Sequence, residues 1–278
     1  MSISGGTKVY GVVGNPVAHS LSPLIHNQWM RELSVDAVYV PVRLTHDDPI
    51  GAIRSMADIG FFGLNVTLPH KISALSAADQ VSETAKAVGA ANTLCLTPDN
   101  GWVAHNTDVE GFKRAAENAV GSRLDQLRVV LIGAGGAARA AAYYLGQAGA
   151  ELAILNRTRA TAESLAAEFA PAAEVAEMSE LMKLSERADL VVNAASLGHS
   201  GAALPTLAAG EGRPFLDLSY GKAAAEVLRS AELSGWKPHD GLAMLVAQAA
   251  AAFELWFSVS PDQASALRAC REKLAVAP

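Results

Sequence analysis

The sequence predicts an α/β protein with two domains, and three observations lead to this fold class. Its 278 residues correspond to about two domains of ordinary size. Short apolar runs alternate with helix-forming segments along most of the chain, which is typical of parallel sheets with crossover helices. Aromatic residues make up only 6% and alanine is abundant, which favours closely packed helices over a β-sandwich.

The first series of elements lies in the N-terminal part of the chain. Its predicted strands are Lys8–Val13, Ala37–Val42 and Phe61–Val66. Helices are predicted after Ser22 and after Asp47. A hairpin follows, because the turn residues Pro98–Gly101 separate two short strands at Thr93–Leu96 and Trp102–Ala104.

The second series begins with an apolar strand at Leu127–Ile132, a glycine-rich turn at Gly133–Ala138 and an alanine-rich helix to about Gly149. A charged helix is predicted at Ala160–Phe169. The further predicted strands are Leu152–Asn156, Leu190–Ala194 and Phe215–Leu218.

After Asp240 and Gly241 the strand pattern stops, and two helices are predicted at Leu242–Phe257 and Asp262–Leu274. The first is the most apolar stretch of the chain. It is nevertheless interrupted by Gln248 and is shorter than the roughly 20 residues that a membrane-spanning helix needs. We therefore expect a buried helix and no membrane partner.

The charge balance excludes other classes of partner. Twenty-two basic and 28 acidic residues give a net charge of −6, and no basic run is present that would bind nucleic acid or an anionic membrane surface. The N-terminus lacks a signal-peptide pattern, and Cys95 and Cys270 lack CxxC spacing, so a cytoplasmic protein with reduced thiols is expected. The seven histidines show no metal-binding spacing, so no metal site is predicted.

The glycine-rich turn predicts a dinucleotide site. It lies directly after a buried strand and before a helix, which is the context that the GxGxxG/A pattern requires. Gly133 permits the tight turn, Gly135 lets the backbone approach a pyrophosphate, and Ala138 allows close helix packing. The predicted phosphate-binding residues are Gly133, Ala134, Gly135, Gly136 and Ala137. A glycine-rich turn without a ligand is the alternative.

The next strand ends at Asn156-Arg157-Thr158-Arg159, where an NAD enzyme would place a carboxylate on the ribose 2′-hydroxyl. A guanidinium binds a 2′-phosphate, whereas a carboxylate repels it. The sequence therefore predicts NADP, with NAD left open. The alternative for Arg159 is a solvated residue at the start of a helix.

Polar residues in the first half predict a substrate site. Hydroxyl and amide groups after predicted strands suit a small, hydroxyl-rich substrate. Lys71 and Asp108 are the catalytic candidates, because a lysine beside an aspartate can exchange a proton with a substrate hydroxyl. Alternatively, Asn65 and Thr67 cap the helix after Pro69, and Asp108 caps the following helix. The other polar candidates are Ser20, Ser22, Asn65, Thr67, Asn92, Asn106 and Thr107.

Together these motifs resemble the shikimate dehydrogenase family, from Tyr10–Pro16 to Asp240–Gln248. The resemblance implies that Ser20, Ser22, Thr67 and Tyr220 hold a substrate carboxylate. It implies that Asn92, Asp108 and Gln248 bind ring hydroxyls and that Lys71 is the catalytic lysine. The cofactor residues that it implies beyond the glycine turn are Asn156, Arg157, Thr158, Arg159, Ser196, Leu218 and Gly241.

The resemblance further implies a substrate domain of residues 1–108 plus 242–278, a Rossmann-type NADP domain of residues 109–241, and an active-site cleft between them. The implied reaction is NADP-dependent interconversion of 3-dehydroshikimate and shikimate by a monomer or homodimer. A quinate/shikimate dehydrogenase that uses NAD or both cofactors is one alternative, and a non-catalytic ligand-binding regulator is another.

Some positions depart from the family pattern. Thr161 stands where many members have a second basic residue, and His199 stands where a methionine is usual. Ser22 favours shikimate, because relatives that use quinate more often have threonine there.

Overall fold

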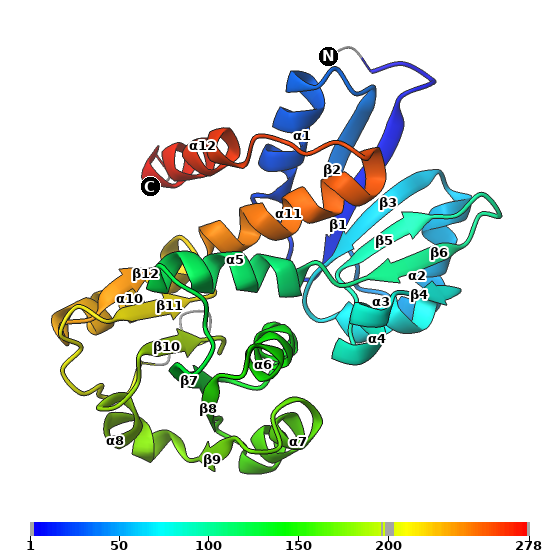
Figure 1. Ribbon diagram of the computed structural model, residues 1–278. Helices are drawn as coiled ribbons and strands as arrows, with labels where there is room; N and C mark the ends of the chain where they lie inside the picture. Colours follow the sequence, from blue (N-terminus) through cyan, green and yellow to red (C-terminus); the bar gives the residue numbers. More distant parts are fainter. Residues whose placement is uncertain (1–2, 196, 198–202, 277–278) are drawn as a thin grey trace. The chain divides into compact units, whose positions relative to one another are not determined.

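The computed structural model describes residues 3–195, 197 and 203–276, and contacts divide the chain into two compact units (Figure 1). Unit 1 is Met1–Gly111 with Leu245–Pro278, and unit 2 is Phe112–Met244. The division falls inside helices α5 (Asp108–Val120) and α11 (Leu242–Phe257). The chain therefore enters and leaves unit 2 within these two helices.

Unit 1 contains a mixed six-stranded sheet in the order β2-β1-β3-β5-β6-β4. Strand β1 is parallel to both β2 and β3. Strand β5 is antiparallel to β3 and to its hairpin partner β6. Strand β4 is parallel to β6. The strands are β1 (Lys8–Gly14), β2 (Ala37–Arg43), β3 (Phe61–Val66), β4 (Gln80–Val81), β5 (Thr93–Leu96) and β6 (Trp102–His105). The predicted hairpin is confirmed.

The helices of unit 1 come from both ends of its sequence. Those of the first part are α1 (Ser22–Glu32), α2 (Pro49–Asp58), α3 (Lys71–Ala77) and α4 (Glu83–Val88). The later part adds α12 (Gln263–Val276) and α11 from Leu245 onward. The Trp256 indole donates to the Leu94 carbonyl at 3.1 Å, and the Trp29 indole donates to the Asp262 carbonyl at 2.9 Å, so the two sequence segments share one core.

Unit 2 contains six parallel strands in the order β12-β11-β10-β7-β8-β9. Read from β9, this is the 3-2-1-4-5-6 order of the Rossmann fold, which confirms the predicted fold class. The strands are β7 (Arg128–Ile132), β8 (Glu151–Leu155), β9 (Glu174–Ala176), β10 (Leu190–Asn193), β11 (Pro214–Asp217) and β12 (Lys237–His239). The helices besides α5 are α6 (Gly136–Ala148), α7 (Arg159–Phe169), a 3₁₀ turn at Met178–Glu180, α8 (Leu181–Ser185) and α10 (Lys222–Leu233).

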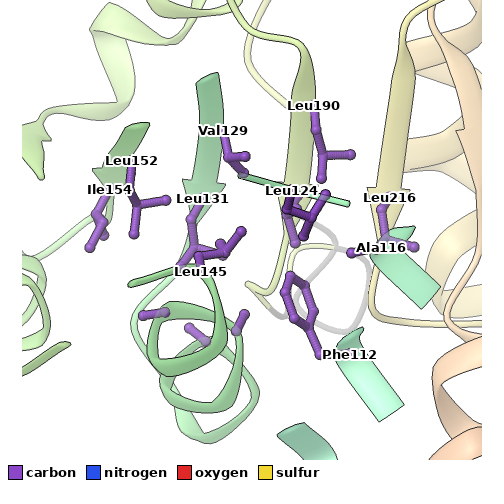
Figure 2. Close-up of a cluster of buried hydrophobic side chains, with 14 of the residues drawn as sticks. Phe112, Ala116, Leu124, Val129, Leu131, Leu145, Leu152, Ile154, Leu190 and Leu216 are labelled. Carbon is purple, nitrogen blue, oxygen red and sulfur yellow. The ribbon is translucent and has the colours of Figure 1, made fainter. Parts of the chain in front are cut away.

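Both faces of this sheet are buried, because successive side chains of each strand point to opposite faces. Val129 and Leu131 of β7 pack with α5, α6 and α7, and Figure 2 shows them on the side of the sheet where Leu145 of α6 lies. Val130 and Ile132 pack with α8 and α10 on the other face. A continuous apolar run is therefore the pattern that this strand needs.

An aromatic cluster in unit 1 contains a histidine that is fully buried. The His26 ring stacks on Tyr39 with a centroid distance of 4.3 Å and meets Trp29 edge-on at 5.7 Å. Neither ring nitrogen has a hydrogen-bond partner of normal geometry among the described residues. Burial lowers the pKa of His26 from 6.5 to about 3, so this imidazole is neutral in the folded protein.

We expect His26 to make the protein less stable in mild acid. The unfolded state takes up a proton near pH 6.5 that the folded state does not bind until about pH 3, so stability is full above the unfolded value and falls as the pH decreases towards 3. Between pH 7 and pH 5 the free energy of unfolding should fall by about 2 kcal/mol more in the wild type than in His26→Phe. Urea unfolding at both pH values measures this, and equal pH dependence in the two proteins would contradict it.

Candidate active site

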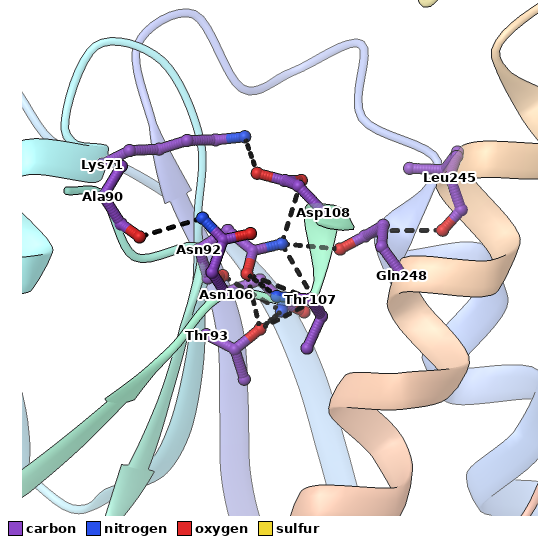
Figure 3. A network of polar contacts seen from close by, with 10 residues as sticks. Lys71, Ala90, Asn92, Thr93, Asn106, Thr107, Asp108, Leu245 and Gln248 are labelled. Carbon is purple, nitrogen blue, oxygen red and sulfur yellow. Dashed lines mark hydrogen bonds and ion pairs between the residues drawn. The ribbon is translucent and has the colours of Figure 1, made fainter. Parts of the chain in front are cut away.

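Lys71 and Asp108 form an ion pair at one edge of the unit 1 sheet, with Nζ to Oδ2 at 2.6 Å (Figure 3). Lys71 begins α3, which follows β3, and Asp108 begins α5, which follows β6. Strand β5 is antiparallel to both strands, so the carboxyl ends of β3 and β6 lie at the same edge as its first residues. The topology thus brings together residues that are far apart in sequence.

Asn92, immediately before β5, joins these side chains. Its Nδ2 lies 3.0 Å from Asp108 Oδ1, 2.9 Å from Thr107 Oγ1 and 3.2 Å from Gln248 Oε1. Its Oδ1 accepts the Thr107 backbone N–H at 2.7 Å. Two amide hydrogens face three acceptors, so the longest contact, to Gln248, is the one most easily given up to a ligand. The bond to Oδ1 leaves Asp108 Oδ2 directed at Lys71.

The Lys71–Asp108 ion pair is mostly buried, but part of it is accessible to solvent. The Lys71 side chain is 14% exposed and that of Asp108 is 7% exposed, so a ligand can reach the ammonium group while the carboxylate remains largely buried. The close opposite charges compensate each other in this environment. The arrangement supplies a charged proton-transfer group beside its own counter-ion.

The other predicted substrate residues of unit 1 lie at or near the same sheet edge. Ser20 and Ser22 follow β1, and the backbone N–H of Ser22 donates to Ser20 Oγ at 3.3 Å. Thr67 directly follows β3, which is parallel to β1. Asn65 lies on β3 and contacts Thr93. Tyr220 follows β11 in unit 2.

The capping alternatives for these residues are wrong. Helix α3 has His70 at its N-cap and no side-chain cap, while Asn65 is hydrogen-bonded to Tyr39 and Thr93. Asp108 is the first residue of α5, and its carboxylate contacts Lys71 and Asn92. The side chains of Asn65 and Asp108 therefore make tertiary contacts.

The glycine turn of unit 2 has the backbone that a pyrophosphate site requires. Gly133 has φ +106°, and a Cβ there would lie 2.8 Å from the Ala195 nitrogen, so only glycine fits without strain. At Gly135, the N-cap of α6, a Cβ would meet nothing within 4 Å. Gly136 and Ala137 begin α6, and Ala134 lies in the turn. The open space at the start of α6 fits a phosphate bound by its first amides.

The segment after β8 carries the predicted 2′-phosphate residues. The Asn156 amide donates to the Thr158 carbonyl at 3.0 Å, which closes the turn before α7. Arg159 pairs with Glu163 at 2.8 Å on the exposed face of α7. Arg157 is exposed and makes no ion pair within the described part of the chain. The residues present therefore fit an anionic ribose substituent, with Arg157 as the available guanidinium.

The remaining predicted cofactor residues follow β10, β11 and β12 in the sequence. Gly241 approaches Leu218 so closely that a Cβ would lie 2.2 Å from the Leu218 carbonyl oxygen. The backbone N–H of Leu218 donates to the Asn193 carbonyl at 2.9 Å. Ser196 and the departure at His199 fall outside the described residues.

Sequence reasoning missed Thr93 as a member of the unit 1 network. Thr93 and Thr107 contact each other and Asn92. Thr107 was among the polar candidates, because it lies between Asn106 and Asp108 in a polar run after β6. Thr93 gave no signal, because a threonine at the start of a strand is common.

Three models of known protein families match the chain. The family described as shikimate dehydrogenase substrate binding domain matches residues 12–94, and shikimate / quinate 5-dehydrogenase matches residues 114–200. Shikimate 5′-dehydrogenase C-terminal domain matches residues 241–271. The matches fall on both units.

Curated relatives and solved structures are similar over nearly the whole chain. The chain is 46% identical to shikimate dehydrogenase (NADP(+)) from Hyphomonas neptunium, covering 96% of this chain and 97% of the relative. It is 39% identical to the Ruegeria sp. protein of the same name, covering 93% and 95%.

A crystal structure of a shikimate dehydrogenase in complex with NADP⁺ has a TM-score of 0.88 and 30% identity, with 98% of both chains covered. The Thermus thermophilus shikimate 5-dehydrogenase in complex with NADP(H) and shikimate has a TM-score of 0.81 and 34% identity, covering 96% of this chain and 100% of that one. The resemblance predicted from the motifs is confirmed. The chain belongs to the shikimate dehydrogenase family.

Proposed function

We propose that this protein catalyses the NADP-dependent interconversion of 3-dehydroshikimate and shikimate, with Lys71 and Asp108 as its catalytic residues. The observation that carries the proposal is the Lys71–Asp108 ion pair, whose carboxylate accepts a hydrogen bond from Asn92 at 3.0 Å. Curated relatives of the chain are named shikimate dehydrogenase (NADP(+)), which supports both the substrate and the cofactor.

The proton transfer is the step that these side chains perform. In the reduction direction the Lys71 ammonium gives a proton to the substrate's carbonyl oxygen as the carbon accepts the hydride. In the oxidation direction the neutral Lys71 amine, or the Asp108 carboxylate, takes the hydroxyl proton as the carbon–oxygen double bond forms. Bound NADP⁺ supplies the acceptor for the hydride from the same carbon. Asp108 keeps the lysine in place and compensates its charge.

We match each group of the substrate to side chains that can form hydrogen bonds with it. Asn92, Asp108 and Gln248 offer amide and carboxylate groups to ring hydroxyls, and the Asn92–Gln248 contact at 3.2 Å exchanges for a bond to the substrate. The substrate carboxylate is assigned to the hydroxyl groups of Ser20, Ser22, Thr67 and Tyr220. Hydroxyl groups can donate to a carboxylate without adding charge.

The cofactor is assigned to the turn after β7 and the segment after β8. Backbone amides at Gly133–Ala137 would hold the pyrophosphate, and Asn156–Arg159 would hold the 2′-phosphate. Ser196, Leu218 and Gly241 are also assigned to cofactor binding.

The direct test mixes the purified protein with shikimate and NADP⁺ and follows NADPH absorbance. Parallel reactions contain quinate instead of shikimate, or NAD⁺ instead of NADP⁺, because one matching family description includes quinate. We expect the highest kcat/KM with shikimate and NADP⁺. No turnover with any pair would overturn the proposal and favour a non-catalytic regulator, whereas a preference for quinate or NAD⁺ would support the alternative dehydrogenase.

Arg157 is expected to recognise the 2′-phosphate. Arg157→Ala should raise KM for NADP⁺ about tenfold, because it removes a charge-assisted hydrogen bond at an exposed site, and should leave KM for NAD⁺ unchanged within about twofold. Steady-state kinetics with both cofactors measures the ratio. Arg123→Ala, at an exposed ion pair with Asp125, is the matched control. An equal rise in both KM values would show that Arg157 does not read the phosphate.

We also propose that the protein is cytoplasmic and is a monomer or a homodimer. No helix in the described ranges is long and apolar enough to cross a membrane. We place the protein in the cytoplasm because Cys95 and Cys270 are both free thiols. Light scattering during gel filtration would distinguish the monomer from the homodimer that the family resemblance implies.

A further inference from the structure

We propose that Tyr39, which does not touch the Lys71–Asp108 pair, is a positioning residue for it. The inference rests on the proposed function, because it assigns Tyr39 a role in that reaction. The basis is a chain of hydrogen bonds that starts at the Tyr39 hydroxyl, crosses three strands of unit 1 and ends at the carboxylate of Asp108.

The first half of this hydrogen-bond chain links β2 to β5 through β3. The Tyr39 hydroxyl donates to Asn65 Oδ1 at 2.7 Å. Asn65 Nδ2 then donates to Thr93 Oγ1 at 3.0 Å and to the Asn92 carbonyl at 3.3 Å. Because the tyrosine hydroxyl occupies the amide oxygen, both amide hydrogens are directed at β5 and its preceding residue. Asn65 therefore has no amide hydrogen left for a substrate, and we assign it to this chain instead.

The second half of the chain reaches the ion pair (Figure 3). Thr93 Oγ1 donates to Asn92 Oδ1 at 3.2 Å, and Asn92 Nδ2 donates to Asp108 Oδ1 at 3.0 Å. Every donor thus points towards Asp108, and each group accepts on one side while it donates on the other. Hydrogen bonds arranged in this order polarise one another.

The four side chains of the hydrogen-bond chain are buried, which favours a single arrangement of donors and acceptors. Tyr39 is 2% exposed, Asn65 5%, Thr93 0% and Asn92 3%, so water cannot replace a missing partner. An unpaired buried donor or acceptor costs about 1–3 kcal/mol. Turning one amide over would leave several such groups unpaired. The Thr107 backbone N–H also fixes Asn92, at 2.7 Å from Oδ1, and the hydrogen-bond chain from Tyr39 adds to this hold on the orientation of Asn92 towards Asp108.

Tyr39 itself is held on its ring and on its backbone. The ring stacks on His26 at 4.3 Å with 12° between the planes. The Asn27 side chain accepts from the Tyr39 backbone N–H at 2.9 Å and donates to its carbonyl at 2.8 Å. Burial raises the pKa of Tyr39 well above its usual value, and a hydrogen bond with Ser22 opposes this in part. The hydroxyl consequently stays protonated and remains a donor.

The test removes one hydroxyl group from the hydrogen-bond chain at each of two positions. Tyr39→Phe keeps the ring stack and removes the hydroxyl, and Thr93→Val keeps the shape of threonine and removes the middle link. Each should lower kcat for shikimate oxidation about 5- to 20-fold and change KM for shikimate less than about threefold, because a misplaced catalytic pair slows the reaction without removing binding groups. Thr93→Ser, which retains the hydroxyl, should keep kcat within about threefold of the wild type.

The double variant Tyr39→Phe/Thr93→Val separates positioning from a general loss of packing. Two breaks in one chain should lower kcat no further than the larger single break, whereas independent effects multiply. Tyr10→Phe removes the hydroxyl of another buried tyrosine of unit 1 and should leave kcat unchanged. Circular dichroism confirms that each variant is folded, and the Thr93 variants decide the question if Tyr39→Phe does not fold.

Unchanged kcat in both folded single variants would overturn the proposal, and so would multiplying effects or an equal loss in Thr93→Ser and Thr93→Val. These outcomes require an active wild-type protein. An inactive wild type would overturn the proposed function itself, which is a distinguishable result.

Discussion

Lys71→Met is expected to lower kcat for shikimate oxidation by about 10²- to 10⁴-fold, the range typical of a lost general acid or base. Methionine has a similar length but no titratable group, so the substrate hydroxyl loses its proton acceptor while the shape of the site is kept. KM should change little, since a proton-transfer group acts mainly in the transition state. Initial rates over a range of shikimate concentrations at saturating NADP⁺ measure both constants.

Lys86→Met is the matched control for this substitution, because Lys86 lies on the exposed side of α4 in the same unit. It should retain the wild-type kcat. If Lys71→Met also retained it, Asp108 or water would have to be the proton acceptor, and the assignment of Lys71 would be wrong.

Asp108→Asn is expected to reduce both activity and stability. The new Nδ2 would face either Lys71 Nζ, which is 2.6 Å from Asp108 Oδ2, or Asn92 Nδ2, which is 3.0 Å from Oδ1, and both of these are donors. The uncompensated, mostly buried ammonium adds to the cost. We expect kcat to fall at least about 10²-fold and the free energy of unfolding to fall by about 2–4 kcal/mol. Steady-state kinetics and urea unfolding without ligands measure the two effects.

The double variant Lys71→Met/Asp108→Asn tests the origin of the instability. Removing the ammonium group should restore part of the lost free energy of unfolding, because no unpaired charge remains, but it should not restore activity. If the double variant were less stable than Asp108→Asn, the lone lysine would not be the cause. If the Asp108→Asn variant were fully active, the Asp108 carboxylate would have no role in the reaction.

The fold was largely predictable because its main signals are local. Residues 127–149 combine a buried strand, a glycine turn and a helix within one continuous segment, so their order alone indicates the nucleotide fold. The strands β4, β9 and β12 were not predicted. Each has only two or three residues and lies at an edge of its sheet, where a short strand needs neither alternation nor a long apolar run.

The candidate site was predictable only where its chemistry is visible in a short segment. Lys71 and Asp108 each follow a strand in a polar run, whereas Gln248 was assigned through the family resemblance alone. Tyr39 gave no signal. Its role depends on the pairing of β2 with β1 and of β1 with β3, which brings it to Asn65 although 26 residues separate them.

The insertion of unit 2 between the two parts of unit 1 also determines the order in which the protein can fold during synthesis. Domains generally fold as units while the chain grows. Unit 2 has all its residues once Met244 has been added, although its synthesis began later than that of unit 1. The N-terminal segment must wait for α11, whose Trp256 donates to Leu94 and whose Gln248 reaches Asn92. The nascent chain therefore completes unit 2 first, and the network that joins Lys71, Asn92, Asp108 and Gln248 reaches its final arrangement last.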